Sequence, residues 1–561
     1  MARFMQVNLV FFLQLCYSLD ISYYFNIFSC QDESSEISKE QKYMERRMRL
    51  FSKVITAAIC GIESCKIGVE ADVSEGMPTF SMVGFLASEV REAQDRVRTA
   101  LKNSGIGLPA KRITVNLAPA DVRKEGSGFD LPIAVAILAA LGYIPQDSLD
   151  GILFVGELSL NGKINCVRGV MEMVASAVGF DCHTCVVPEG NLREGSVIQG
   201  VRVLGADSLQ QVLRFLTGGE KLREIFINIE EIRSGQAENT GIDFADIQGQ
   251  TVLRRACEVA VSGMHNLLMV GPPGAGKTMT AKRIPTILPK TSLEEALEIS
   301  KIHSIAGLLP EEMGLMTLRP FRSPHHTVTP VALAGGGRTP RPGEVSLAHR
   351  GVLYLDELPE FQNGTLEILR QPLEEGKVSI SRNSGSYLFP ANFMLVASMN
   401  PCKCGYYPDR NRCTCSLREV KRYLDHVSQP LLDRIDICVE AQPVLYSELT
   451  SGERGESSAS IRRRVTQAQK IQQERYRGTE FRFNSDLTMS AVKQYCSLGK
   501  EEQNLMEETF EKLELTARAY CKILKVARTI ADLDGREQIS LAHLGEAVCY
   551  RSLDKKYWTK Q

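Results

Sequence analysis

One short motif near the middle of the chain limits its possible folds more than any other feature. Residues 271–278 read GPPGAGKT and directly follow NLLMV, a run that predicts a buried β-strand. The spacing G-x-x-x-x-G-K-[ST] after a strand is typical of a phosphate-binding loop that opens a helix. A glycine-rich turn without a ligand is the alternative, but strand, loop and lysine together favour phosphate binding.

Each position of this motif has a chemical role. Glycines let backbone N–H groups wrap phosphates at a helix N-terminus, the lysine brings positive charge to the β- and γ-phosphates, and the threonine hydroxyl can bind Mg²⁺. We therefore expect ATP and Mg²⁺ as cofactors. The expected nucleotide-binding residues are Gly271, Pro272, Pro273, Gly274, Ala275, Gly276, Lys277 and Thr278.

Two further apolar runs end in polar residues that suit ATP hydrolysis. GVLYLDEL ends near Asp356 and Glu357, and a carboxylate at the tip of a buried strand is costly unless it meets a cation. We expect Asp356 to share Mg²⁺ with Thr278, and Glu357 to polarise the attacking water. ANFMLVASM is followed by Asn400, which could position that water; a simple strand-end cap is the competing interpretation.

The chain divides into blocks of different pattern. Residues 51–215 alternate short β-like and helical runs, which predicts an α/β domain. Residues 216–242 are charged and polar and are interpreted as a linker. Residues 243–445 hold the apolar strands of a parallel-sheet core, and residues 455–555 show helical periodicity. The net charge of −1 predicts no polyanion binding by the chain as a whole, so any basic surface must be local.

The first 47 residues differ from the rest of the chain. Residues 7–17 form an apolar run that is too short to span a bilayer. Three interpretations stay open for this atypical extension: a signal or anchor, a disordered extension, or sequence upstream of a true start at Met48. Later segments lack the apolar length of a membrane span, so we expect a cytoplasmic protein without stable membrane association.

Longer strings of sequence resemble one family. GPPGAGKT, LYLDEL, SMN and LLDRIDI together resemble AAA+ ATPases. FRSPHHTVTPVALAGGG, MNPCKCGYY and LTARAYCKILKVARTIADL resemble the Mg-chelatase-like AAA+ ATPases of the YifB/ComM group, and the resemblance covers residues 51–551. It implies an α/β multidomain protein with a Lon-protease-like N-terminal domain, a P-loop AAA+ parallel-sheet core and a helical C-terminal lid.

The resemblance also implies roles for three polar residues. It places Asn400 as the γ-phosphate sensor and Arg518, in LTARAY, as a second sensor, with a solvated helix charge as the alternative for the latter. Arg434 is either ion-paired locally or an arginine finger that reaches the phosphate of another subunit, and the resemblance implies the finger. A finger acting in trans requires a ring of identical subunits, and we expect a hexamer.

The N-terminal domain resembles a protease without its catalytic pair. In the Lon fold a lysine activates a serine nucleophile. Alignment of RITVNLAPADVRKEGSGFDLPIA puts the serine position at Gly128 and the lysine position at Met171, neither of which can do this chemistry. Ser127 lies next to the first position, so the exclusion of an ATP-dependent protease depends on the register. For such a domain the resemblance implies DNA binding and ring assembly.

Candidate DNA contacts lie between the second and third strands. EEGKVSISRNSGSYLF reads as a β-hairpin in which Lys377 and Arg382 could meet DNA phosphates; a solvent-exposed hairpin is the alternative. Binding of single-stranded or branched DNA would be led by the backbone and depend on salt. His325 and His326 lack a third metal ligand in the sequence, and we interpret them as structural loop residues.

Four of the sixteen cysteines follow Asn400 closely. Two C-x-C pairs suit a closed tetrahedral zinc site, although C-x-C is tighter than the usual spacing. A disulfide, which a reducing cytosol disfavours, and four unligated thiols are the alternatives. The expected zinc ligands are Cys402, Cys404, Cys413 and Cys415.

These features point to an ATP-hydrolysing ring motor that acts on DNA. The resemblance implies branch-migration or helicase activity in recombination and natural transformation, as in ComM-type proteins. The alternative is a magnesium-chelatase-type ATPase that remodels a partner protein. The N-terminal domain and the cysteine cluster argue against that alternative, because a dedicated chelatase motor is typically a shorter AAA+ chain without such a domain.

Overall fold

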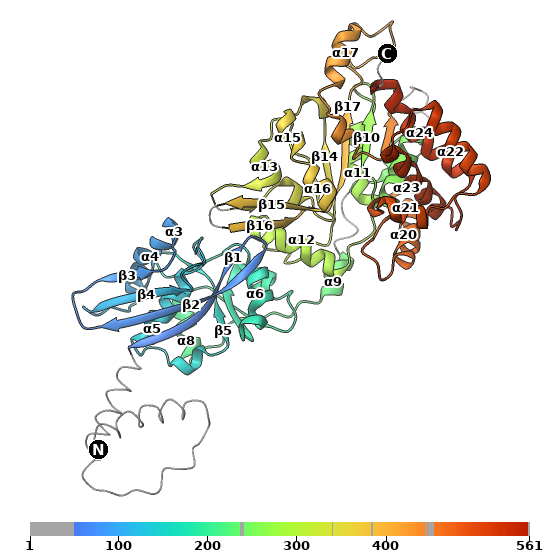
Figure 1. The fold of residues 1–561 in the computed structure, drawn as a ribbon. Coiled ribbons are helices and arrows are strands. Elements are labelled where there is room, and N and C mark those ends of the chain that lie inside the picture. Colours follow the sequence, from blue (N-terminus) through green and yellow to red (C-terminus); the bar gives the residue numbers. More distant parts are fainter. Residues whose placement is uncertain are drawn as a thin grey trace, which may run out of the picture.

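The computed structural model describes residues 50–558, apart from 236–240, 339, 383–384, 444–445 and 447–453. The atypical extension, residues 1–47, lies outside the described residues. Figure 1 shows the N-terminal sheet domain at one end of the molecule and the second sheet with the C-terminal helices at the other. The site predicted from the P-loop belongs to the second sheet.

The N-terminal domain is built on a mixed seven-stranded sheet. β1 and β2 form a long antiparallel hairpin, while β5, β8 and β9 continue the sheet in parallel from β1. The spatial order is β3 (Phe80–Val83), β4 (Arg112–Ala118), β2 (Glu63–Ser74), β1 (Phe51–Cys60), β5 (Ile152–Phe154), β8 (Thr184–Pro188) and β9 (Arg202–Ala206).

One helix of this domain is apolar on every side. All residues of α5 (Asp130–Ala140) are buried, because it packs against β1 and β2 and against α4 (Ala93–Asn103). Its single charge, Asp130, is held by Arg96, whose Nε lies 2.7 Å from Oδ2. The other helices of the domain are α3 (Ser88–Arg91), α6 (Val170–Ala177), α7 (Leu192–Gly195) and α8 (Leu209–Leu216).

The second sheet has five parallel strands, which confirms the predicted parallel-sheet core. Every residue of β10, β14 and β17 is buried, as expected for a parallel sheet covered on both faces. The spatial order is β11 (Phe321–Arg322), β14 (Val352–Leu355), β17 (Met394–Met399), β10 (Leu267–Val270) and β18 (Ile437–Glu440).

Helices and short strands surround this sheet. The hairpin predicted over residues 377–389 is present as β15 (Lys377–Arg382) and β16 (Gly385–Pro390). A small pair, β12 (Gly335–Gly336) and β13 (Arg341–Pro342), lies nearby in the chain. The helices are α10 (Thr251–Gly263), α11 (Lys277–Ile287), α12 (Leu293–Ala306), α13 (Pro330–Ala334), α14 (Glu344–Leu347), α15 (Asn363–Glu367), α16 (Arg370–Glu375), α17 (Leu417–Leu424) and α18 (Gln429–Leu432).

The N-terminal domain and the second sheet meet at α12. This helix packs against α6, and Lys301 Nζ lies 2.8 Å from Glu172 Oε2 across the contact. The segment interpreted as a linker takes part as well, because it contains α9 (Ile229–Gly235), and Ile229 packs in one apolar cluster with Ala296 of α12. The described part of this segment therefore packs against α12 through Ile227, Ile229 and Ile232.

The C-terminal block is helical, as the periodicity predicts. Its helices pack onto α10 and β18. They are α20 (Ser458–Arg475), α21 (Met489–Tyr495), α22 (Lys500–Lys512), α23 (Ala517–Leu533) and α24 (Leu541–Trp558).

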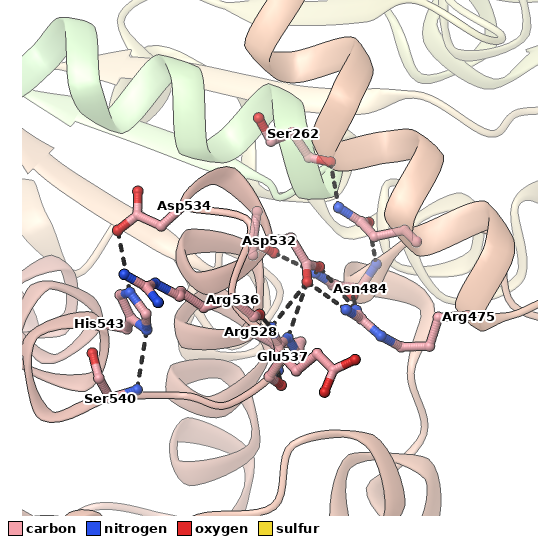
Figure 2. A network of polar contacts seen from close by, with 12 residues as sticks. Ser262, Arg475, Asn484, Arg528, Asp532, Asp534, Arg536, Glu537, Ser540 and His543 are labelled. Carbon is pink, nitrogen blue, oxygen red and sulfur yellow. Dashed lines mark hydrogen bonds and ion pairs between the residues drawn. The ribbon is translucent and has the colours of Figure 1, made fainter.

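A buried ion network joins these helices. Figure 2 shows Arg475, Arg528 and Asn484 converging on Asp532, whose side chain is fully buried. Arg475 Nη1 and Asn484 Nδ2 each lie 2.9 Å from Asp532 Oδ2, and Arg528 Nε lies 3.1 Å from Oδ1. One carboxylate thus connects α20, the turn before α21 and α23.

We predict that Asp532→Ala destabilises the C-terminal helices by about 3–5 kcal/mol, because it leaves two buried guanidinium groups without their carboxylate. Hydrogen exchange of the α23 amides would measure this loss. Asp534→Ala is the matched control: this carboxylate is half exposed and contacts His543, so its removal should cost less than about 1 kcal/mol. Equal protection in both variants would contradict the prediction.

Candidate functional site

The phosphate-binding loop connects the end of β10 to the start of α11. Gly271 has no room for a side chain, since a Cβ there would lie 2.3 Å from Ala441 O on the chain after β18. Gly274 and Gly276 both have φ of +79°, a conformation that favours glycine. The glycines predicted from the motif are therefore required by the local backbone.

Lys277 is buried at the centre of the loop. Its Nζ donates to Gly271 O at 2.7 Å, Pro272 O at 2.9 Å and Asn400 Oδ1 at 3.1 Å. Burial lowers the pKa of Lys277, although the carboxylates of Asp356 and Glu357 oppose this shift. Because β10 and β17 are neighbours, the ends of these strands bring Lys277 and Asn400 together.

The predicted pair of Mg²⁺ ligands is also assembled. Thr278 Oγ1 donates to Asp356 Oδ2 at 2.8 Å, and Ser398 Oγ donates to Asp356 Oδ1. The Tyr354 hydroxyl donates to Ser398 Oγ at 3.0 Å. Burial alone would raise the pKa of Asp356, but the hydrogen bonds from Ser398 and Thr278 outweigh it and hold the pKa below its usual value. An ionised carboxylate beside a hydroxyl suits Mg²⁺.

Glu357, the candidate for polarising water, sits in a strained position beside a histidine. Its φ is +53°, in the left-handed region, and its side chain is more than half exposed. His326 Nδ1 lies 3.7 Å from Glu357 Oε2, whereas His325 bonds within its own loop to Thr327. His326 therefore lies beside Glu357, a contact that the sequence analysis did not predict.

Among the described residues, Arg434 contacts neither the phosphate-binding loop nor the expected Mg²⁺ ligands. Its guanidinium pairs with Glu374 on α16 and donates to Pro430 O. Arg518, at the start of α23, is 69% exposed, and its Nη1 lies 3.6 Å from Asp433 Oδ2. Arg434 itself and the partner of Arg518, Asp433, thus belong to the same short segment, which follows α18.

The backbone beside Arg434 is fixed by the C-terminal helices. Lys522 Nζ and Arg551 Nη1 both donate to Ile435 O, each at 2.7 Å. Burial lowers the pKa of Lys522 to about 8. The next residue, Asp436, would have its pKa raised by burial, but contacts with His265 and Lys522 lower it instead. Side chains of α23 and α24 therefore hold the backbone next to Arg434.

The four clustered cysteines come together in space. The Sγ of Cys402 lies 3.3 Å from that of Cys404 and 3.8 Å from that of Cys413, and all four sulfurs lie within 4.8 Å of one another. Such a group could hold a metal ion. The loop also rests on the phosphate-binding loop, because a Cβ on Gly405 would lie 2.5 Å from Pro273 Cδ.

The candidate DNA contacts lie on the hairpin at the domain junction. Lys377 opens β15, and Arg382 at its end donates from Nε to Gly337 O at 3.3 Å. Tyr387 of β16 packs over Gly61, which follows β1. The hairpin thus bridges the second sheet and the N-terminal domain, next to a pocket of about 740 Å³ that Ser127 and Gly128 help to line.

Gly128 and Met171, the positions aligned with the catalytic serine and lysine of the Lon fold, have different surroundings. Gly128 lines that pocket, whereas Met171 is fully buried and its backbone N–H donates to Glu194 Oε1 at 2.9 Å. Neither residue carries a nucleophile or an amine.

Gln250, in the segment before α10, donates from Nε2 to Ala275 O at 3.3 Å and so lies against the phosphate loop.

Three family profiles match successive parts of the chain. Magnesium chelatase, subunit ChlI, matches residues 243–449, which hold the phosphate loop and the second sheet. Subunit ChlI of Mg-chelatase matches residues 69–191 in the N-terminal domain. Magnesium chelatase, subunit ChlI C-terminal, matches residues 455–551, the helical block.

Similarity to whole proteins covers nearly all of the described chain. Competence protein ComM of Haemophilus influenzae is 42% identical over 503 residues, covering 89% of this chain and 97% of that protein. The uncharacterized protein YifB of Escherichia coli is 42% identical over 510 residues, covering 90% and 97%. The chain belongs to the Mg-chelatase-like proteins of the YifB/ComM group. Membership of this group indicates an ATPase that uses ATP and Mg²⁺.

One more distant relative matches only part of this chain. The magnesium-chelatase 67 kDa subunit of Chlorobaculum parvum is 26% identical over 207 residues, which is 36% of this chain and 27% of that protein.

Among the described residues, no helix combines the length and the apolar character needed to cross a membrane.

We predict that Ser398→Ala raises the Mg²⁺ concentration needed for half-maximal ATP hydrolysis by about tenfold, because Asp356 loses the hydrogen bond that orients it. A magnesium titration of the ATPase rate would measure this. Ser379→Ala removes a comparable hydroxyl on the hairpin, where it pairs with Ser386, and should leave the titration unchanged. An unshifted curve for Ser398→Ala would show that this serine does not position the carboxylate.

Proposed function

We propose that this protein is a ring-forming ATPase motor that acts on DNA, with a role in recombination or the uptake of DNA during natural transformation. The contact of Lys277 with Asn400, beside the pair formed by Thr278 and Asp356, supports ATP hydrolysis. Identity of 42% with a protein named for competence supports the DNA substrate. Branch migration or helicase action is the activity that fits both.

The ring is proposed from the finger role that the family resemblance implies for Arg434, while the structure shows the local ion pair that is the alternative for Arg434. Its guanidinium is turned to Glu374 and Pro430, so the finger role requires the phosphate of another copy. Arg518 lies close by, through Asp433, and we assign it as the second sensor on the same subunit face. A ring of identical subunits, a hexamer, lets each copy complete the site of its neighbour.

The hairpin supplies the proposed DNA contact. Lys377 and Arg382 bracket β15, and both side chains are exposed. In a ring, six such hairpins would present positive charge to a DNA backbone, in a manner that depends on salt. Magnesium-chelatase-type remodelling of a protein partner is the second candidate, favoured by the three chelatase family profiles and by the match to the 67 kDa chelatase subunit.

DNA-dependent hydrolysis tests this function. We predict that single-stranded or branched DNA raises the ATPase rate severalfold, and that raising the salt concentration weakens DNA binding. Arg434→Ala serves as the control, because it should keep ATP binding yet abolish hydrolysis. A rate that DNA leaves unchanged, with no DNA binding, would contradict a DNA motor and favour protein remodelling.

We also propose that the four cysteines hold a structural Zn²⁺. Zn–S bonds of about 2.3 Å place the sulfurs of a tetrahedral site about 3.8 Å apart, close to the observed separations. The backbone N–H of Tyr407 donates to Cys402 Sγ at 3.4 Å, as expected for a thiolate ligand. All four ligands come from protein, so the ion would stabilise the loop without taking part in catalysis.

Metal analysis tests this site. Protein purified under reducing conditions should contain about one zinc per chain, and Cys404→Ser should lose it. Because the loop rests on Pro273, we also expect this variant to bind ATP more weakly. Cys549→Ser changes an exposed cysteine outside the cluster and should retain the metal. Zinc-free wild-type protein would contradict the proposal and leave the nucleotide site unaffected.

A further inference from the structure

Two surfaces, far apart in the sequence, match each other in charge and in apolar character. The first is the cysteine module, residues 401–424, made of the cysteine loop and α17. Figure 1 shows α17 projecting from the end of the second sheet that lies away from the N-terminal domain. The module has only two acidic residues, Asp409 and Glu419, against six exposed basic residues: Lys403, Arg410, Arg412, Arg418, Lys421 and Arg422.

An apolar side chain stands among these charges. Leu417, the first residue of α17, is 58% exposed. The start of the helix is fixed by Ser416 and Glu419, which form a reciprocal capping box. A helix whose start is fixed before binding loses little backbone freedom on association, so the module is suited to an interface.

The basic side chains of the loop are held as well. The guanidinium of Arg412 lies 4.1 Å from the centre of the Tyr406 ring, and that of Arg410 lies 5.1 Å from the Tyr407 ring. Arg410 also donates to Cys415 O at 3.1 Å. The positive surface is thus a fixed pattern on the loop.

The second surface is the acidic groove between α22 and α23. It has a volume of about 460 Å³, and Phe510, at its edge, is 41% exposed. Helix α22 carries five glutamates and two lysines. The groove combines an apolar floor with an acidic rim, and the lining residues used here are Leu498, Met506, Phe510, Tyr520, Glu507 and Glu511.

The two surfaces adjoin opposite halves of the proposed shared ATP site. The module touches the phosphate loop, where Gly405 lies against Pro273. The groove adjoins the arginine face, which we define as the surface that carries Arg434 and Arg518. Ala517 lines the groove, and the next residue, Arg518, pairs with Asp433. A contact between the module of one copy and the groove of the next would therefore bring the arginine face toward a phosphate loop.

We propose that the cysteine module of one copy docks into the acidic groove of the neighbouring copy of this chain. Leu417 enters the apolar floor, and the basic residues of α17 face Glu507 and Glu511. This contact is head to tail, so its repetition closes a ring. A nucleic acid is the competing occupant of the module, but a phosphate backbone offers no apolar pocket to the exposed leucine. The proposal rests on the proposed ring.

Charge reversal tests the contact in the full-length chain. The triple variant Arg418→Glu, Lys421→Glu, Arg422→Glu should weaken assembly with ATP and Mg²⁺ at least about tenfold, as measured by sedimentation. Adding Glu507→Arg and Glu511→Arg should restore assembly. Leu417→Asp, at an exposed position that does not threaten folding, should weaken assembly as well.

A matched control uses three exposed basic residues of the C-terminal helical block: Arg463→Glu, Lys470→Glu, Arg477→Glu should assemble like the wild type. A photo-crosslinking residue at position 417 should link to residues 498–520 of another copy. Assembly that resists the module reversal, a link elsewhere, or a monomeric wild type would overturn the proposal. So would a reversal that lowers DNA binding alone. A ring without DNA-stimulated hydrolysis would contradict the DNA motor and leave this contact standing.

Discussion

The nucleotide site depends on one ammonium group buried among oxygen atoms. The three hydrogen bonds of Lys277 run to Gly271 O, Pro272 O and Asn400 Oδ1, and a buried cation without such partners would be costly. The bonds join the loop after β10 to the end of β17, so they require these strands to be neighbours. Phosphate oxygens, which form stronger charge-assisted bonds, can take the place of these acceptors.

In the C-terminal half, buried carboxylates hold together side chains from separate segments, as Lys277 does in the nucleotide site. Asp532 collects three side chains from separate segments, and Asp436 is held by His265 and Lys522. Lys522 also donates to Ile435 O, next to Arg434. Lys522 thus both pairs with Asp436 and fixes the backbone next to Arg434.

Features carried by consecutive residues could be predicted from the sequence. The P-loop, the strand that ends before Asp356 and the strand that ends before Asn400 are all readable as apolar runs with polar tips. Their meeting follows from the order of a parallel sheet. The hairpin of β15 and β16 was readable for the same reason.

Partners that come from distant parts of the chain could not be predicted in this way. Ser398 lies inside an apolar run and reads as core, yet it orients Asp356. His326 approaches Glu357, and Glu374 pairs with Arg434, because folding brings separate loops together. Residues 216–242 looked polar as a whole, and the isoleucines that pack on α12 were outnumbered by charges. Only the three-dimensional path of the chain reveals these pairs.

The pairing of Arg434 with Glu374 has a consequence for how copies recognise one another. The guanidinium is already largely desolvated, with 14% of its side chain exposed, and it already holds an anion. Meeting a neighbour would therefore be an exchange of counterions rather than the dehydration of a free cation. In the proposed ring, the direction of this exchange would depend on how many negative charges the neighbour's nucleotide carries. In the proposed ring, the Glu374 carboxylate would compete with the neighbour's nucleotide for Arg434, and a triphosphate would displace it more readily than a diphosphate.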